Sequence, residues 1–302
     1  MLLRSKQRRC KLRTIILAKS FFPQKRQRHH GAICHYQFRG GAIGPASAMR
    51  VRTSTSSDSA HLRLRLRLES SVMFLAQVSI DLVNAVRHLK AFLQPSALDD
   101  ESLILKTILW EGFSGSAIRP WSIHAQRGPK TIILGYSRFD ASELNKRRAL
   151  ALPSVQEAGG EASAVPLPSL SSGERYRFTI RLVPTIRVTK AEGRRYGERD
   201  AFLVKADAVG KEAGLKREEV YRAYLAERLV GAMVEDSRLV QFRLRKFMRP
   251  QKDGSVSGKT MPETVIEGHL RVDDPVKLYE AIGTGIGRQR AYGCGMLRLQ
   301  PV

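Results

Sequence analysis

The segment 285–302, GIGRQRAYGCGMLRLQPV, carries the most specific pattern in the chain. It contains two pairs of glycines, each pair separated by a single residue: Gly285 and Gly287, then Gly293 and Gly295. Glycine lacks a Cβ, so it adopts positive φ at little cost and lets a backbone approach a phosphate chain closely. Arg288 and Arg290, between the pairs, would add positive charge at the point of approach. The pattern predicts a glycine-rich loop followed by a short last strand.

The overall composition favours a polyanionic partner. The chain has 302 residues, 42% of them hydrophobic, and 52 basic against 28 acidic residues give a net charge of +24. Such a balance is typical of nucleic-acid-binding proteins. No apolar run approaches the roughly 18 residues of a membrane span, so we expect no membrane partner. The length and a mean hydropathy of −0.27 indicate two modest domains.

The three cysteines, Cys10, Cys34 and Cys294, form neither a paired framework nor a CxxC metal spacing. We therefore expect a reducing, cytoplasmic setting and no zinc site. No cluster of Asp, Glu and His is evident in the sequence, and we expect no metal and no cofactor.

Residues 1–72 differ from the rest of the chain. They hold 16 Lys and Arg against only Asp58 and Glu69, a net charge of +14, and they show no sustained periodicity. This segment is interpreted as a basic low-complexity extension, with three alternatives: a disordered RNA-binding arm, a transit peptide, or upstream sequence included by a mis-assigned start. The last is favoured, because Met73 begins a segment typical of a natural first strand.

From residue 73 the chain shows the order β-α-β-β-α-β twice, which is the order of a ferredoxin-like domain. In the first unit we expect strands at 73–80, 121–126, 130–136 and 175–182, helices at 81–94, 101–113 and 141–150, and a linker at 153–173. In the second unit we expect strands at 201–206, 238–248, 265–272 and 296–299, with helices at 217–233 and 275–282. The expected inward face of the strand at 238–248 is Val240, Phe242 and Leu244. The predicted class is α+β, with tandem ferredoxin-like (RRM-like, RAMP) domains at 73–190 and 191–302.

Four stretches together resemble the CasE family, the RAMP-type CRISPR RNA processing subunit of type I-E systems. They are MFLAQVSID from Met73, the Leu109-Trp110-x-x-Phe113 motif, RYRFTIRLVP at 175–184, and the C-terminal segment 265–302. The third departs from the family pattern, because Val183 stands where the family usually has an asparagine. The resemblance covers about 230 residues, and the C-terminal segment is its most specific part.

The resemblance implies a function. Such proteins bind the hairpin of a CRISPR repeat transcript and cut at its 3′ base, and they remain with the product as a subunit of the Cascade complex. Cleavage in the family is metal-free: the 2′-hydroxyl attacks the adjacent phosphate, which requires a base, an acid and positive charge near the phosphate.

The position that the family uses for catalysis is altered here. The family histidine lies four residues before the tryptophan, often with a tyrosine three residues further back, and these positions are Lys106 and Leu103. A lysine can stabilise the phosphorane as a cation or donate a proton, and it becomes a base only if burial lowers its pKa. His88, on the preceding predicted helix, would substitute only if that helix folded over the cleft. His124 and His269 are interpreted as ordinary strand residues.

Further residues are candidates for RNA binding. The resemblance implies that the basic run just after the first domain follows the phosphates of the hairpin, and that a basic residue precedes the strand at 265–272. Tyr292, within the glycine loop, could stack on a base. The RNA-binding candidates are Arg181, Lys190, Arg194, Arg195, Arg199, Lys259, Arg288, Arg290, Tyr292 and the four glycines Gly285, Gly287, Gly293 and Gly295.

Two alternatives remain beside a CasE-like endoribonuclease. Lys106 favours a noncatalytic, hairpin-holding subunit of the same assembly. A general RNA-binding protein with RRM-like domains is the other, although no predicted strand carries the aromatic RNP pattern that stacks single-stranded bases.

Overall fold

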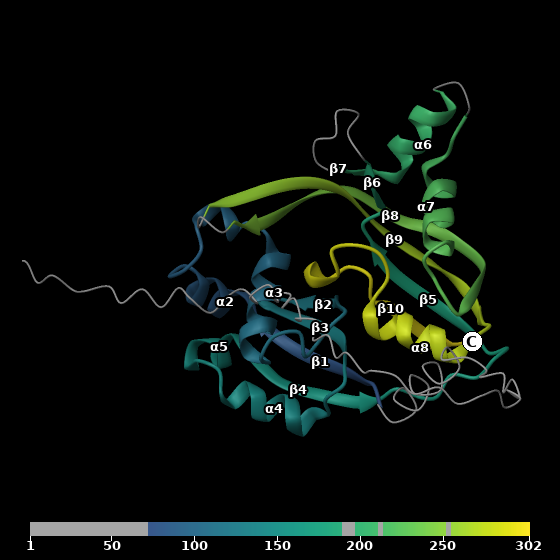
Figure 1. The fold of residues 1–302 in the computed structure, drawn as a ribbon. Helices are drawn as coiled ribbons and strands as arrows, with labels where there is room; N and C mark the ends of the chain where they lie inside the picture. Colours follow the sequence, from purple (N-terminus) through teal and green to yellow (C-terminus); the bar gives the residue numbers. More distant parts are fainter. Residues whose placement is uncertain (1–71, 189–196, 211–213, 252–254) are drawn as a thin grey trace, which may run out of the picture. The chain divides into compact units, whose positions relative to one another are not determined.

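The computed structural model describes residues 72–188, 197–210, 214–251 and 255–302 (Figure 1). The extension expected at 1–72 therefore lies outside the described residues, apart from its last position. Among the described helices, none is both long and apolar enough to cross a membrane. The two four-stranded sheets and the two-stranded sheet found among the described residues all belong to one compact unit of the chain.

The first sheet is antiparallel and has the strand order β2-β3-β1-β4. Its elements in chain order are β1 Phe74–Asp81, α2 Leu82–Leu89, η1 Pro95–Ala97, α3 Glu101–Gly112, β2 Trp121–Arg127, β3 Lys130–Ser137, α4 Ala141–Ala149, α5 Pro153–Ala158 and β4 Gly159–Pro166. Alternate residues of β1, among them Val78 and Ile80, face α3, where Leu105 and Ile108 are fully buried. This is the ferredoxin-like order, in which one helical connection joins β1 to β2 and another joins β3 to β4.

The linker expected at 153–173 is wrong for most of its length. Residues 153–158 form helix α5, and Gly159–Pro166 forms the edge strand β4 beside β1. Small residues fit this edge because Ala162 is buried against the core, and the Asn145 side chain bonds both the N–H and the C=O of Ala162. A composition typical of a linker was therefore misleading, since the open edge of β1 supplies the hydrogen bonds that make it a strand.

The second sheet is antiparallel with the order β10-β5-β9-β8, again ferredoxin-like. Its elements are β5 Arg175–Leu182, α7 Arg217–Ala226, β8 Ala232–Pro250, β9 Val256–Val272, α8 Pro275–Thr284, η2 Arg290–Tyr292 and β10 Leu297–Pro301. Between β5 and α7 lie the hairpin of β6 Thr185–Val188 and β7 Gly197–Asp200, and then α6 Ala201–Val209. The predicted α+β class and the glycine-rich loop before the last strand are confirmed.

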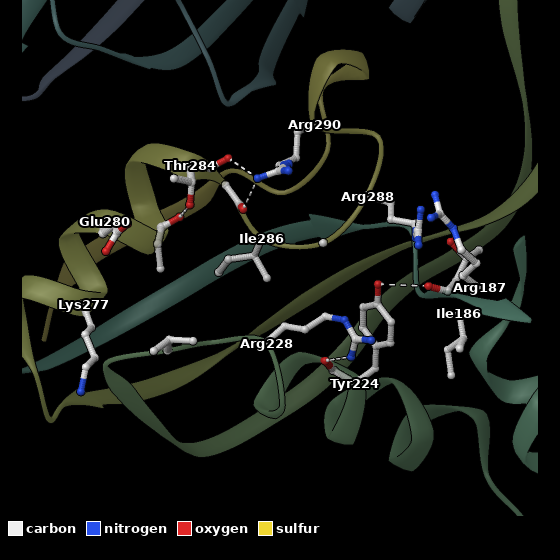
Figure 2. A pocket seen from close by; sticks show the side chains of 15 residues that line it. Ile186, Arg187, Tyr224, Arg228, Lys277, Glu280, Thr284, Ile286, Arg288 and Arg290 are labelled. Atoms are coloured by element: carbon white, nitrogen blue, oxygen red, sulfur yellow. Dashed lines mark hydrogen bonds between the residues drawn. The ribbon is translucent and has the colours of Figure 1, made fainter. Parts of the chain in front are cut away.

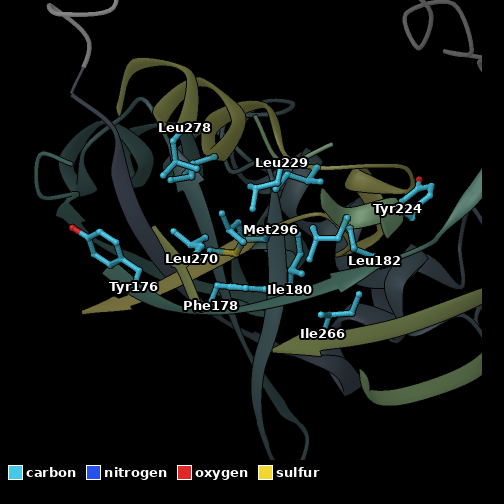
Figure 3. Packing of buried hydrophobic residues seen from close by; sticks show 14 of the residues in the cluster. Tyr176, Phe178, Ile180, Leu182, Tyr224, Leu229, Ile266, Leu270, Leu278 and Met296 are labelled. Carbon is cyan, nitrogen blue, oxygen red and sulfur yellow. The ribbon is translucent and has the colours of Figure 1, made fainter. Parts of the chain in front are cut away.

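The strand at 175–182 was expected to close the first sheet, and that assignment is wrong. It forms the centre of the second sheet, between β9 and β10. Its inward residues Phe178, Ile180 and Leu182 pack with α8 and with Leu270 of β9 (Figure 3). The change of sheet thus falls between β4 and β5, before the boundary expected near residue 190, and the proposed domain limits stay a prediction.

The strand expected at 201–206 is also wrong, because Ala201–Val209 is helix α6. Asp200 decides this: its carboxylate accepts the Phe202 N–H at 2.9 Å and caps the helix. The same carboxylate pairs with Arg217 at 2.6 Å and accepts from the Tyr221 hydroxyl at 2.9 Å, so α6 is tied to α7. A side-chain cap satisfies N–H groups that a strand would have had to pair elsewhere.

The strand expected at 238–248 is present, but the prediction that its apolar residues face inward is wrong. Val240, Phe242 and Leu244 are 50%, 39% and 66% exposed. β8 is the edge strand, and α7 covers its central residues only in part: Phe242 meets Tyr221, with ring centres 6.3 Å apart, and the Arg217 guanidinium lies 4.5 Å from the centre of the Phe242 ring. The first buried residues of β8 are Phe247 and Met248, which pack in one cluster with Leu103 of α3.

Candidate nucleic-acid interface

The glycine loop adopts the backbone geometry that the sequence predicts. Gly285, Gly287, Gly293 and Gly295 all have positive φ, between 77° and 80°. The loop closes on itself through a 2.8 Å bond from the Ile286 N–H to the Gly295 C=O. The Gly295 N–H donates to the Arg181 C=O at 2.7 Å, which fixes the loop to β5.

Three of these glycines also lack space for a side chain, and the obstacle is the protein itself. A Cβ on Gly285 would lie 2.9 Å from Pro120, and a Cβ on Gly293 would lie 2.6 Å from the Trp121 ring. A Cβ on Gly295 would collide with the Ile286 carbonyl oxygen. Only at Gly287 would a Cβ make ordinary contacts, the nearest at 3.4 Å. The close approach permitted by glycine is thus used mainly for packing against the start of β2.

The loop brings Tyr292 against Lys106 of α3. The Lys106 ammonium lies 4.7 Å from the centre of the Tyr292 ring, and the edge of that ring meets Phe247 with the ring centres 5.9 Å apart. A cation over an aromatic face is attracted by its quadrupole. Tyr292 is only 8% exposed. It therefore orients Lys106, and it offers little free surface for the base stacking that the sequence analysis expects of it.

Lys106 lies in surroundings that favour proton release. Burial lowers its pKa below the ordinary value, and the charges of Arg249 and Arg119 lower the pKa further, against a smaller opposing effect of Asp100. Within the described part of the chain, neither Lys106 nor Arg119 forms an ion pair with a carboxylate. Three cations thus converge beside the glycine loop, and a lysine in such a group is a proton donor nearer neutral pH than usual.

Asp100 positions this group of cations. One carboxylate oxygen accepts from the N–H and hydroxyl of Ser102, at 3.0 and 2.6 Å, and caps α3. The other accepts the Met248 N–H of β8 at 2.8 Å. One side chain therefore fixes the start of the helix that carries Lys106 to the strand that carries Arg249.

Arg181 belongs to a buried ionic cluster beneath the loop. Glu263 is 2% exposed and faces Arg181 at 3.9 Å, Arg243 at 2.6 Å and Arg245 at 2.9 Å. Burial alone would raise the pKa of Glu263, but the hydrogen bond from Arg245 and the charges of the three arginines lower it, so the carboxylate stays ionised. Arg181 thus has a structural role, and its RNA-binding role stays a prediction.

Most of the other described candidates are ion-paired. Glu198 of β7 faces Arg288 at 2.7 Å and Lys259 at 3.4 Å, with Arg249 at 3.9 Å. Arg199 pairs with an aspartate of α6 at 2.8 Å. Arg290 donates to the backbone carbonyls of residues 284 and 285. Lys190, Arg194 and Arg195 lie outside the described residues.

His88 does not reach Lys106. It is buried between α2 and α5, with 2.8 Å bonds to the Ser154 hydroxyl and to the Glu111 carboxylate. Glu111 follows Lys106 by five residues on α3, about 140° around the helix axis, so the two side chains point to different faces. A role as substitute base is therefore not supported by this geometry. Among the described residues, no group of three or more His, Cys, Asp or Glu comes together as metal ligands would.

Arg119 and Arg249 are the functional candidates that sequence reasoning missed. Arg119 precedes Pro120 in a segment with no periodic pattern, and nothing local distinguishes it. Arg249 ends the basic run on β8 and could have been found from that run. Their proximity to Lys106 depends on contacts between segments far apart in the chain.

Comparison with known proteins identifies the family. A family model described as "CRISPR associated protein" matches residues 73–301, well over half of the chain. The CRISPR-associated endoribonuclease Cse3 of Thermus thermophilus is 29% identical over 143 residues, which are 44% of this chain and 59% of that protein. The chain thus spans about 59% of the length of this curated relative.

Solved structures show a similar fold. A structure of CRISPR endoribonuclease Cse3 bound to a 19-nucleotide RNA matches with a TM-score of 0.51 and 18% identity, over 76% of this chain and 100% of the other. Cas6e from Escherichia coli K-12 matches with a TM-score of 0.48 and 19% identity over the same shares. The Cse3 match agrees with the tandem ferredoxin-like architecture and shows the fold alone. On the family match, the chain belongs to the CRISPR associated protein family, and the resemblance to CasE is confirmed.

Proposed function

We propose that this protein binds the hairpin of a CRISPR repeat RNA, cleaves the transcript at the 3′ base of that hairpin without a metal ion, and stays with the product as a Cascade subunit in the cytoplasm. The observation that carries the proposal is Lys106, held over Tyr292 beside Arg119 and Arg249 with a lowered pKa. The family membership and the endoribonuclease activity named for Cse3 support it.

The proposed reaction needs only groups of the protein and the RNA, together with solvent water. The 2′-oxygen attacks the adjacent phosphorus as its proton passes to a solvent water molecule, and the bond to the 5′-oxygen breaks. The products are a 2′,3′-cyclic phosphate and a 5′-hydroxyl. Lys106, as the ammonium, donates a proton to the leaving 5′-oxygen, while Arg119 and Arg249 stabilise the charge that develops on the phosphate.

A second candidate is a subunit that holds the hairpin and does not cut it. The specific observation in its favour is that a lysine stands at the position where the resemblance implies a histidine. In that case Lys106 serves as a phosphate contact, and the cations around it contribute affinity only.

The first experiment incubates the full chain with its own repeat RNA in EDTA, beside a 2′-deoxy substrate at the cleavage site and the Lys106→Ala variant. We expect cleavage at the hairpin base that is lost with the 2′-deoxy substrate, and a rate reduced roughly 100-fold or more in Lys106→Ala. Tight binding without cleavage by the wild-type protein would support the hairpin-holding subunit instead. Failure to bind the hairpin at all would overturn both.

The pH dependence separates proton transfer from simple charge. Arginine keeps the cation of Lys106 but does not release a proton in the accessible range. We expect the wild-type cleavage rate to fall as the pH rises through the lowered pKa of Lys106, below the ordinary value of 10.5, because the ammonium is the active form. In Lys106→Arg we expect a slower reaction without that decline. Equal rates and equal pH profiles would show that Lys106 acts only as a cation.

A further inference from the structure

A basic pocket adjoins the first part of the glycine loop, and the residues that line it include neither Tyr292 nor Lys106 (Figure 2). It has a volume of about 590 Å³ and is formed by the end of α8, the loop at 285–288, the end of α7 and the start of β6. A cavity of this size is in the usual range for a small-molecule ligand or a single nucleotide. Four of the RNA-binding candidates line it, Gly285, Gly287, Arg288 and Arg290, whereas Lys106, Arg119 and Arg249 do not.

The charge of the pocket wall favours an anion. Among the described residues that line the wall, Glu280 is the one acidic side chain, against five basic ones: Arg187, Arg228, Lys277, Arg288 and Arg290. Three of these cations also have a carboxylate partner that is not part of the wall: Glu227 for Arg228, Asp274 for Lys277 and Glu198 for Arg288. The five basic side chains come from four separate segments, so their grouping is a product of the fold. Phosphate oxygens are the anionic groups that such arginine clusters bind best.

The floor of the pocket is suited to a flat ligand. The Arg228 guanidinium lies over the Tyr224 ring, 3.6 Å from its centre, and donates to the Tyr224 carbonyl at 3.1 Å. This holds the planar group in one orientation, with one face on the ring and a third of the side chain exposed. Arginine planes of this kind stack on nucleic-acid bases.

The pocket also adjoins the proposed cleavage site. Arg290 and Thr284 line both this pocket and a neighbouring cavity of about 680 Å³ whose wall includes Arg119. Arg119 in turn is one of the cations that lower the pKa of Lys106. Arg119 and Arg290 therefore line one cavity, and Arg290 is shared between that cavity and the pocket.

We propose that this pocket takes an unpaired nucleotide of the RNA strand that adjoins the hairpin, with its base on the Arg228 guanidinium and its phosphate toward Arg288 and Lys277. The inference rests on the proposed function and adds a second contact region to it. A paired nucleotide is excluded from such a pocket, because its base is stacked within the duplex and neither face of the base is accessible. An unpaired base can turn out of the strand and enter.

The test compares two RNAs by fluorescence anisotropy at fixed salt, using the full chain. One is the repeat hairpin alone, and the other carries a few unpaired nucleotides on both sides, with 2′-deoxy substitution at the cleavage site. We expect the flanked RNA to bind roughly tenfold more tightly, as one base stack and one phosphate contact would give. In Arg228→Gln this preference should fall to nearly one, while the affinity for the bare hairpin should change little.

Two further variants keep the test decisive. Arg222→Gln, which removes the same charge from an exposed position on α7 outside the pocket, should retain the tenfold preference. The Lys277 side chain is 63% exposed, so Lys277→Gln should fold normally. We expect this variant to reduce the preference for the flanked RNA two- to fivefold. A wild-type protein that binds both RNAs equally, or an Arg228→Gln variant that weakens both equally, would overturn the pocket and leave the proposed function intact. A wild-type protein that binds neither RNA would overturn the proposed function, and this inference with it.

Discussion

The four loop glycines share one conformation but differ in what surrounds them. Each has a positive φ, which costs a non-glycine residue about 1–2 kcal/mol. Gly295 meets a second restriction, because the Ile286 carbonyl occupies the place of its side chain. Gly173, in the turn before β5, has φ of 86° and open space around it. Alanine substitution at Gly173 therefore tests the cost of backbone strain alone, and at Gly295 it tests strain together with overpacking.

We expect Gly295→Ala to lower the free energy of unfolding by about 3 kcal/mol or more, since backbone strain and overpacking both apply. The matched variant Gly173→Ala should lower it by about 1 kcal/mol, from strain alone. Urea denaturation of both variants measures the difference. Equal losses would show that the Gly295 contact relaxes without cost.

At the scale of elements, the position of α3 depends on its N-cap residue, Asp100. Asp100 satisfies the start of α3 and also accepts the Met248 N–H of β8. Asp140 caps α4 in the ordinary way, accepting one N–H at 2.8 Å at an exposed position. Both are helix caps, but only Asp100 connects the helix to the other sheet.

We expect Asp100→Ala to cost about 3 kcal/mol of unfolding free energy, because it removes a cap and leaves the buried Met248 N–H without an acceptor. Asp140→Ala should cost about 1 kcal/mol. Thermal or urea unfolding measures both, and hairpin affinity should fall in Asp100→Ala alone, as α3 loses its fixed position. Similar costs for the two variants would contradict the connecting role.

At the scale of the whole molecule, the excess of positive charge is divided between structure and surface. The acidic groups Glu263 and Glu198 each hold several basic side chains, so those cations contribute to folding as well as to any RNA contact. Arg249 is only loosely paired, 3.9 Å from Glu198, and it lies beside Lys106. Affinity for RNA should therefore depend on salt through a limited set of cations.

We expect the logarithm of hairpin affinity to fall linearly with the logarithm of salt concentration, and Arg249→Gln to reduce the slope by about one. Arg87→Gln, at an exposed position on α2 where it bonds to Asn84, removes the same charge and should leave the slope unchanged. Anisotropy titrations at several salt concentrations give the slopes. Equal slopes for all three proteins would exclude a phosphate contact by Arg249.

Local patterns allowed much of the architecture to be predicted. The alternation in 73–80, the helical spacing in 101–113 and the glycine pairs each act within a few residues, so the sequence alone specified them. The net charge and the family resemblance are likewise properties of the chain itself. They were sufficient for the fold class and for the region of Lys106 and the glycine loop.

Only the tertiary structure decided which sheet β5 joins, which face of β8 is exposed and what surrounds Lys106. An alternating strand fits the edge of either sheet equally well, and the choice depends on partners more than 80 residues away. The pKa of Lys106 likewise depends on its burial and on the charges of Arg249 and Arg119, and all three arise only after the two four-stranded sheets have formed. Contacts between distant segments are set by the packing of the whole fold, and no local window of the sequence contains them.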